Sequence, residues 1–228
     1  MIFYFSIYKD EIYAVRLAKQ LNDIFPGVKV IAIADGSCYL PSIDAAMNFN
    51  PNLEFIQGDR LKNAANGGMK FTHRNFSEIL KHDFDIAIKL DPDSYVWREP
   101  KYIPDAQWFG NVFQQDLYFL GKKLQTIGGG AMGFKRSTVE RLHDSKALLD
   151  FRYDTVETFY DRYRKFKKFS DPDNETGLVR SEDWTLAHVC DRLSIKPTHW
   201  DDVKSVQSEE QIYPDLEYFV THPCRTIW

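Results

Sequence analysis

The sequence predicts an α/β fold in which helices flank a central, mostly parallel sheet. Three observations indicate this class. Short apolar runs rich in β-branched residues recur along the first half, segments with helical spacing of apolar residues lie between them, and turn residues close most of these segments. Alternation of strand and helix is typical of a parallel sheet with right-handed crossovers. A length of 228 residues is suited to one domain.

The first half supplies most of the predicted sheet. The run IFYFSIY (2–8) is the first expected strand, and VKVIAIA (28–34) is a near-continuous apolar run of the kind found in strands buried on both faces. Between them, Ala14, Leu17, Ala18 and Leu21 repeat with helical spacing. The remaining expected elements of this half are strands at 53–58 and 84–90 and a helix at 68–81.

The second half predicts fewer regular elements. A strand is expected at 107–113, and GGGAMGF (128–134) is expected to be a glycine-rich loop leading into a helix with Ser137 and Glu140 as its capping box. A further helix opens at Ser181, a favourable N-cap residue, and buries an apolar stripe. The stripe consists of Leu186, Val189, Cys190 and Leu193.

Composition excludes several classes of function. The formal net charge of −4 argues against a general nucleic-acid binder, which would show a basic surface. Three widely spaced cysteines without a CxxC motif predict neither a disulfide framework nor a zinc knuckle. No apolar run approaches the ~20 residues that a membrane-spanning helix needs. We therefore expect a soluble, cytoplasmic protein without a transmembrane segment, unless a partner holds it peripherally at a membrane.

The segment KLDPDSY (89–95) places two carboxylates at the carboxyl end of a predicted central strand. Ligands of open α/β sheets bind beyond this edge, and Pro92 ends the strand because it cannot donate to the ladder. Asp91 and Asp93 repel each other unless a cation or a proton lies between them. Oxygen ligands suit Mg²⁺ and Mn²⁺, so a divalent metal is one solution, and a turn with helix-capping acids is the other.

The same tripeptide occurs at Asp171 and Asp173, within SDPDNETG. No strand is predicted before this second copy, and its neighbours have loop composition. We therefore expect a solvated loop there. The phosphatases of the haloacid-dehalogenase type also carry Asp-x-Asp after a strand, but with Thr or Val where this chain has Tyr95, and on the first strand of the chain.

Four landmarks in order resemble the GT-A fold glycosyltransferases, which transfer a sugar from a nucleotide-sugar donor. KLDPDSYV resembles their DxD motif in its fringe-like form, and GGGAMGFKRS resembles their glycine-rich loop on the acceptor side. SEDWTLAHVCDRLSI resembles the xED motif, and THP resembles the C-terminal histidine. The resemblance implies a single Rossmann-like GT-A domain, with a nucleotide-sugar-binding half at about 1–105 and an acceptor-binding half at about 106–228.

The resemblance also implies functional residues. Asp91, Asp93 and His222 would hold Mn²⁺ or Mg²⁺, and Asp183 would deprotonate the acceptor in an inverting reaction, with Glu182 as second choice. An acidic first turn favoured by the helix dipole explains both acids without catalysis. Acceptor-binding residues would be Gly128, Gly129, Gly130 and Trp184, although a tight turn explains the glycines. Trp108, Trp184 and Tyr118 could stack against sugar faces, and core packing explains these aromatic residues equally well.

Donor-binding residues are expected at the other strand ends. Asp35 would contact the base or ribose and Tyr8 would pack on the base, although a turn Asp and a half-buried aromatic are ordinary alternatives. Lys70 and Arg74, one helical turn apart, could reach the donor phosphates or face solvent. His73 and His199 are expected to be structural.

The implied partners are a UDP sugar or another nucleotide-sugar donor and a glycan or glycosylated acceptor, with no nucleic acid. Three alternatives remain. A non-catalytic glycan-binding module would not consume the donor, and a phosphatase of the type named above would act on phosphoesters without a sugar nucleotide. A sugar nucleotidyltransferase would carry a basic, glycine-rich loop after its first strand, where this chain reads SIYKDEIY.

Overall fold

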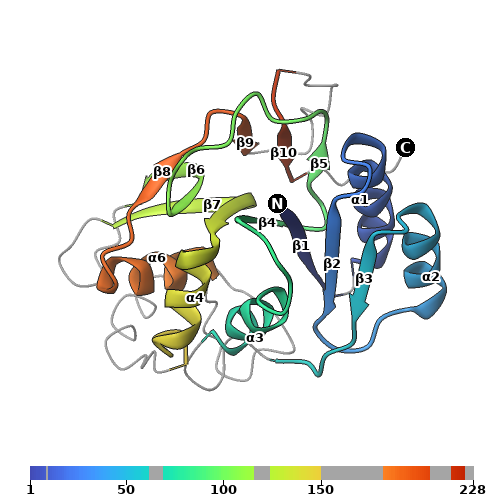
Figure 1. Cartoon of the computed structure of the whole chain (residues 1–228), viewed down its shortest axis with the longest axis horizontal. Helices are drawn as coiled ribbons and strands as arrows, with labels where there is room; N and C mark the ends of the chain where they lie inside the picture. Colours follow the sequence, from blue (N-terminus) through green and yellow to red (C-terminus); the bar gives the residue numbers. More distant parts are fainter. Residues whose placement is uncertain (9, 62–68, 116–123, 150–181, 206–216, 224–228) are drawn as a thin grey trace, which may run out of the picture.

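A computed structural model of the chain describes residues 1–8, 10–61, 69–115, 124–149, 182–205 and 217–223 (Figure 1). The helices are α1 (Glu11–Ile24), α2 (Leu40–Phe49), α3 (Lys70–Ile79), α4 (Arg136–Asp144) and α6 (Glu182–Arg192). The strands of the first half are β1 (Ile2–Ile7), β2 (Lys29–Ala34), β3 (Leu53–Ile56), β4 (Ile86–Leu90) and β5 (Tyr95–Val96). The others are β6 (Trp108–Gln115), β7 (Leu124–Lys135), β8 (Pro197–His199), β9 (Val203–Ser205) and β10 (Val220–His222).

The central sheet has seven strands in the order β3-β2-β1-β4-β7-β6-β8. The four strands β3, β2, β1 and β4 are parallel, and the β6–β8 pair is parallel as well. The long strand β7 runs antiparallel to both β4 and β6. The predicted α/β class, with a mostly parallel sheet flanked by helices, is therefore confirmed.

Each face of the sheet has its own apolar core. On one face, α3, α4 and α6 pack over a cluster that includes Tyr4, Phe76 and Trp108. The opposite face is covered by α1, by α2 and by the small sheet of β5, β10 and β9 (Figure 1). The predicted apolar face of α1 is buried there, since Ala14, Leu17, Ala18 and Leu21 are at most 1% exposed.

The antiparallel pair β6–β7 extends beyond the carboxyl edge of the parallel strands. Leu90, the last residue of β4, lies opposite Ala131, whereas β7 begins at Leu124 and stays paired with β6 as far as Gln115. The overhang from Ala131 back to Leu124 corresponds to roughly 20 Å of strand. This two-stranded extension therefore lies beside the edge at which open α/β sheets bind their ligands.

Two expectations for the second half are wrong. Gly128–Gly130 lie inside β7, not in a loop. Helix α4 has Lys135 as its N-cap residue and no side-chain cap hydrogen bond, and Glu140 accepts from Arg136 Nε (2.8 Å), so Ser137 and Glu140 form no capping box. The second Asp-Pro-Asp copy, Ser181 and Tyr118 lie outside the described residues.

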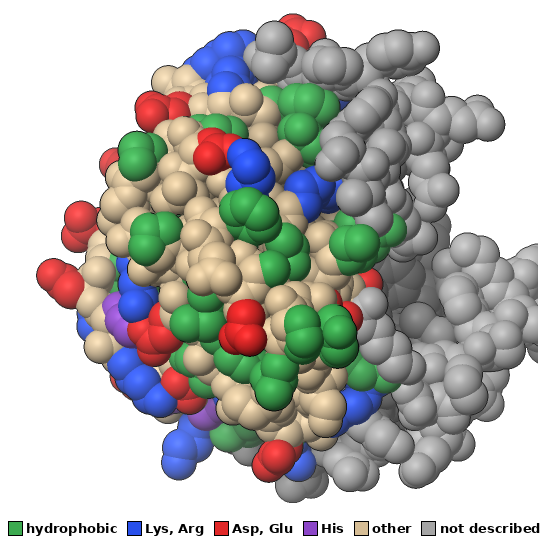
Figure 2. Space-filling model, turned by 90° about the vertical axis from the view of Figure 1, so that its right-hand side faces the viewer, with side chains coloured by type: hydrophobic (Ala, Val, Ile, Leu, Met, Phe, Trp, Pro, Cys, Tyr) green, Lys and Arg blue, Asp and Glu red, His purple; other side chains and the backbone are tan. Residues whose placement is uncertain are grey.

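Helix α2 was not expected from the sequence. It buries Ile43 and Ala46 and leaves Leu40, Met47 and Phe49 exposed. Figure 2 views the molecule from this side and shows hydrophobic side chains scattered among polar and charged ones. Among the described helices, none is both long and apolar enough to cross a membrane.

Candidate metal centre and donor site

The turn after β4 directs the two carboxylates. The Asp91 N–H donates to the Gly130 carbonyl of β7 (3.2 Å), and the Ser94 N–H donates to the Asp91 carbonyl (2.9 Å). The fully buried Ser94 hydroxyl also donates to the Gly130 carbonyl (2.8 Å). These bonds fix the backbone on both sides of Pro92, so the side chains of Asp91 and Asp93 are held just beyond the edge of the sheet.

His222 reaches the same place from the other end of the chain. It ends β10, which pairs with β5 through Val220 and Val96 and with β9 through Val220 and Val203. The Trp97 N–H donates to the Phe219 carbonyl and the Trp97 indole N–H to Thr221 Oγ1, each over 2.9 Å. His222 therefore projects from a paired strand.

Asp91, Asp93 and His222 converge on one point. His222 Nε2 lies 3.4 Å from Asp91 Oδ2 and 3.1 Å from Asp93 Oδ1. One ligand atom from each of the three residues lies within 4.8 Å of the others. Two carboxylates and one imidazole are a donor set that suits Mn²⁺, and the site is partly buried, so these residues fit a divalent metal.

The backbone of Gly130 borders this site. Its N–H donates to Asp91 Oδ2 (3.1 Å), and its φ is +106°. A Cβ at this position would lie 2.3 Å from the Cβ of His222. Gly130 is therefore needed for the close approach of β7 to β10, and its contact with an acceptor stays a prediction.

Lys89 lies on β4, two residues before Asp91, and contacts the Asp91 carboxylate. It pairs in register with Tyr4 and Met132, both about 1% exposed, and its own side chain is 8% exposed. Its Nζ donates to Asp91 Oδ1 over 3.0 Å. Although burial acts to raise the pKa of Asp91, the charges of Lys89 and His222 and the Gly130 N–H outweigh it and lower this pKa to about 2.

The carboxylates change the pKa of His222 in the opposite direction. Burial acts to lower this pKa, but the hydrogen bond to Asp93 and the negative charges of Asp91 and Asp93 outweigh burial and raise it above the usual value. In the absence of a cation, the imidazolium therefore neutralises part of the charge of the carboxylate pair. A metal ion must displace this proton to bind Nε2.

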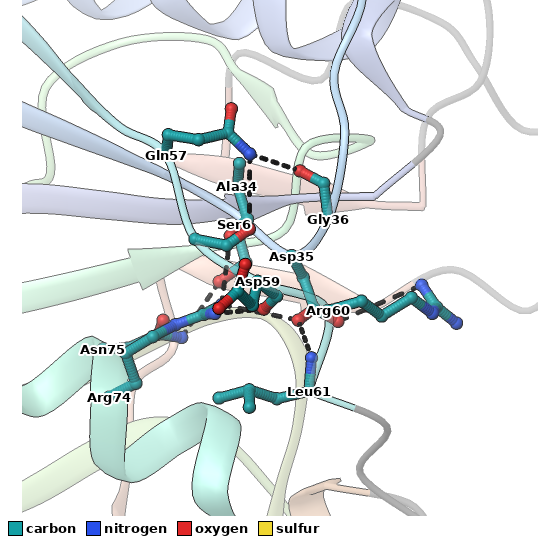
Figure 3. Close-up of polar contacts among 11 residues, drawn as sticks. Ser6, Ala34, Asp35, Gly36, Gln57, Asp59, Arg60, Leu61, Arg74 and Asn75 are labelled. Atoms are coloured by element: carbon teal, nitrogen blue, oxygen red, sulfur yellow. Dashed lines mark hydrogen bonds and ion pairs between the residues drawn. The ribbon is translucent and has the colours of Figure 1, made fainter.

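A second polar cluster lies at the carboxyl ends of β1, β2 and β3 (Figure 3). Asp35 Oδ1 accepts from the Leu61 N–H (2.7 Å) and from Arg74 Nη2 (3.4 Å). Arg74 also donates to the carbonyls of Asp59 and Ala34. Its guanidinium is therefore turned to the strand ends and not along the helix face beside Lys70, which is exposed.

Tyr8 is covered on one face by Arg60. The guanidinium carbon of Arg60 lies 3.2 Å from the centroid of the Tyr8 ring, and Arg60 Nη1 lies 4.0 Å from Asp35 Oδ2. Asp35 contacts Arg74 directly and is linked to Tyr8 through Arg60, so these residues lie in one cluster. Their contact with a nucleotide stays a prediction.

Helix α6 begins beside the overhanging part of β7. Thr126 Oγ1 donates to the Asp183 carbonyl over 2.9 Å, so the first turn of α6 lies four residues along β7 from Gly130. That separation corresponds to roughly 13 Å of strand. The predicted apolar stripe is confirmed, with Leu186, Val189 and Cys190 at most 1% exposed. The side chains of Glu182 and Trp184 lie outside the described part of the chain.

The remaining aromatic and histidine candidates have structural surroundings. Trp108 is fully buried in the core. His73 stacks on His143 with 4.4 Å between ring centroids, and His199 Nδ1 accepts from the Val112 N–H over 3.1 Å. These contacts agree with the expectation that both histidines are structural.

Sequence reasoning missed Lys89, Ser94 and Arg60. For Lys89 the signal was visible, because a lysine inside the apolar run FDIAIKL must find a partner when the strand is buried. Ser94 carried no signal beyond its place after the motif. Arg60 follows β3 in a segment whose spatial neighbours the sequence does not reveal.

Comparison with solved structures defines the class of fold. The galactosyltransferase LgtC, in complex with donor and acceptor sugar analogues, superposes with a TM-score of 0.52 at 13% identity, over 98% of this chain and 87% of its own. An active-site mutant of LgtC superposes over the same shares with a TM-score of 0.51 at 13% identity. The chain therefore has the GT-A fold of glycosyltransferases.

A third solved structure is less similar. A mannosyltransferase from Pyrobaculum calidifontis, in complex with GDP-mannose and Mn²⁺, covers 62% of this chain and 46% of its own at 12% identity with a TM-score of 0.41. No protein-family profile and no curated protein sequence matches the chain.

Proposed function

We propose that the protein is a metal-dependent glycosyltransferase. It moves a sugar from a nucleoside-diphosphate sugar, a UDP sugar in our assignment, to a hydroxyl of a glycan or another acceptor. The observation that carries this proposal is the convergence of Asp91, Asp93 and His222 at the carboxyl end of β4, in a sheet of the GT-A fold.

The strand order supports a division of labour along the edge of the sheet. Asp35 and Tyr8 lie at the ends of β2 and β1 and would take the nucleoside. Asp91, Asp93 and His222 lie at the next strand end and would hold Mn²⁺, which as a Lewis acid stabilises a departing diphosphate. The overhang of β6–β7 lies beyond them and would border the acceptor.

Asp183 is the residue that we assign as general base. As the acceptor oxygen bonds to the anomeric carbon and the bond to the donor phosphate breaks, the hydroxyl proton would pass to the Asp183 carboxylate. Direct displacement of this kind inverts the anomeric configuration. The assignment rests on the resemblance of SEDW to the xED motif and on the fixed first turn of α6 beside Thr126.

A panel of nucleotide sugars tests the proposed class. Each donor is added with and without Mn²⁺, thermal stabilisation identifies the donor that binds, and release of its nucleoside diphosphate is then measured with mixed glycan acceptors. We expect one donor group to stabilise the protein only with the metal. Binding without diphosphate release would indicate a glycan-binding or nucleotide-binding module, and turnover of simple phosphoesters would indicate a phosphatase.

Asp93→Asn supplies the control for this assay. It should abolish metal-dependent donor binding, because it removes a charged ligand from the centre. The double variant Asp171→Asn, Asp173→Asn changes the same tripeptide elsewhere and should leave binding nearly unchanged. Equal losses in both variants contradict the argument from strand position.

A further inference from the structure

Lys89 raises a question that the proposed metal centre does not answer. A buried ammonium costs free energy unless it is paired, and Lys89 is paired with a residue that would itself bind a cation. Its Nζ donates to Asp91 Oδ1 at 3.0 Å, and its side chain is 8% exposed. A second positive charge beside a cation site weakens that site.

The two carboxylate oxygens of Asp91 have different partners. Oδ1 accepts from Lys89, and Oδ2 accepts from the Gly130 N–H at 3.1 Å and faces His222 Nε2 at 3.4 Å. Asp91 therefore offers a divalent ion a carboxylate whose charge is already partly compensated. With neutral His222, the two carboxylates and Lys89 together carry a net charge of −1.

A nucleoside diphosphate would change this balance, because its phosphates would bring the negative charge that the protein lacks. Lys89 cannot move away easily, because it is buried on β4, with Tyr4 of β1 and Met132 of β7 as its neighbours in register. Its charge therefore acts on the empty and on the occupied centre alike, and an ion gains most when the diphosphate is present.

We propose that Lys89 is a positioning residue that makes tight metal binding depend on the donor diphosphate. It orients Asp91 and offsets its charge, so that the free protein binds a divalent ion weakly and the ion and the diphosphate bind cooperatively. The inference rests on the proposed function for the identity of the diphosphate ligand. The effect of Lys89 on the binding of the ion alone does not depend on catalysis.

The test is a calorimetric titration of the metal-free full chain with Mn²⁺, without and with saturating UDP, at pH 7.5. We expect UDP to tighten Mn²⁺ binding to the wild type about tenfold or more, and by linkage Mn²⁺ to tighten UDP equally. Lys89→Met keeps the length of the side chain and removes its charge. This variant should bind Mn²⁺ alone about tenfold more tightly and lose a similar factor of the UDP effect.

Three further variants separate charge from structure. Lys89→Gln keeps a donor for Asp91 without the charge and should behave as Lys89→Met, whereas Lys89→Arg should resemble the wild type. Lys135→Met removes a different lysine–aspartate pair, that with Asp105, and should change neither constant. Thermal melts identify the variants that fold.

Two outcomes overturn the inference in different ways. If folded Lys89→Met and Lys89→Gln bind Mn²⁺ alone no more tightly than the wild type, while UDP still tightens Mn²⁺ in the wild type, the role of Lys89 is wrong and the proposed function stands. If UDP has no effect on Mn²⁺ binding in the wild type, the coupling and the assigned donor class are both wrong.

Discussion

Replacement of Gly130 by alanine tests the metal centre through the backbone and leaves its three ligands unchanged. Gly130 has a φ of +106°, and an added Cβ would meet His222 Cβ at 2.3 Å and Cγ at 2.8 Å. The backbone fixes the Cβ of His222, which therefore cannot rotate away, so either β7 or β10 must shift. We expect Gly130→Ala to displace His222 from Asp91 and Asp93.

The magnitude has two parts. A non-glycine residue in this part of backbone space costs about 1–3 kcal/mol. Overpacking against His222 adds about 1–3 kcal/mol. The sum, about 2–6 kcal/mol, lowers the melting temperature by roughly 2–4 °C for each kcal/mol in a chain of this length. In addition, Mn²⁺ should no longer raise the melting temperature.

Gly27→Ala is the matched control. Gly27 also has a positive φ of +85°, but a Cβ there would meet nothing within 4 Å. This variant should show the conformational cost of about 1–3 kcal/mol alone and keep the full Mn²⁺-dependent stabilisation. The assay is thermal unfolding of both variants across a Mn²⁺ titration. If Gly130→Ala binds Mn²⁺ as the wild type does, His222 does not lie where the structure places it, or it is not a ligand.

Three further predictions concern this centre and the assigned base. His222→Ala should weaken Mn²⁺-dependent UDP binding, measured by calorimetry, whereas His199→Ala, at a half-exposed histidine outside the centre, should not. In the metal-free wild type, the pKa of His222 is raised in the folded state. The ion pairs of the protonated imidazole therefore stabilise the fold fully below the unfolded pKa of about 6.5. This contribution is lost as the pH rises through the folded pKa. Mn²⁺ affinity should follow the opposite course and rise across that window, above pH 6.5, and both pH dependences should be absent from His222→Ala. Asp183→Asn should keep donor binding and lower transfer about 10²-fold or more, and a product of retained anomeric configuration, seen by proton NMR, would remove Asp183 from the role of base.

Most of the parallel strands of the sheet could be predicted from the hydrophobic pattern of the sequence. β1, β2 and β4 are apolar runs because each has a strand on both sides and a core on both faces, so the sequence has little room for polar residues. The position of the carboxylate pair follows as well, because Asp91 comes directly after the last apolar residue of β4. Each of these features depends on a short stretch of consecutive residues, so the sequence alone predicts it.

Helix α2 escaped recognition for a physical reason. It buries Ile43 and Ala46, whereas Leu40, Met47 and Phe49 are exposed. A helix with apolar residues on both sides of its axis has no clear periodicity in sequence. The small sheet escaped for another reason, since strands of two or three residues are too short to show alternation.

The glycine-rich segment was assigned the wrong structure because the same residues suit a loop and a crowded strand. Gly133 lies where a Cβ would meet the Phe109 ring at 2.1 Å, and at Gly110 of the neighbouring strand β6 a Cβ would meet Ile127 at 2.4 Å. Glycine inside a strand often marks such close approaches. These contact partners lie 24 and 17 residues away along the chain, and the sequence alone does not show that they meet.

The centre itself joins what is local with what is not. Asp91 and Asp93 are set by one turn, but His222 arrives through β10, which depends on pairing with β5 and β9 and on the bonds from Trp97. A ligand that binds all three residues therefore stabilises the docking of β10 on the rest of the fold by mass action. The same linkage means that a change far from the ligands can weaken metal binding. Arg98 binds Asp202 and the Glu217 carbonyl, and the Asp202 carbonyl accepts from the N–H groups of Phe219 and Val220. This network holds the segment that carries His222, so the affinity of the proposed metal centre should depend on contacts made well outside it.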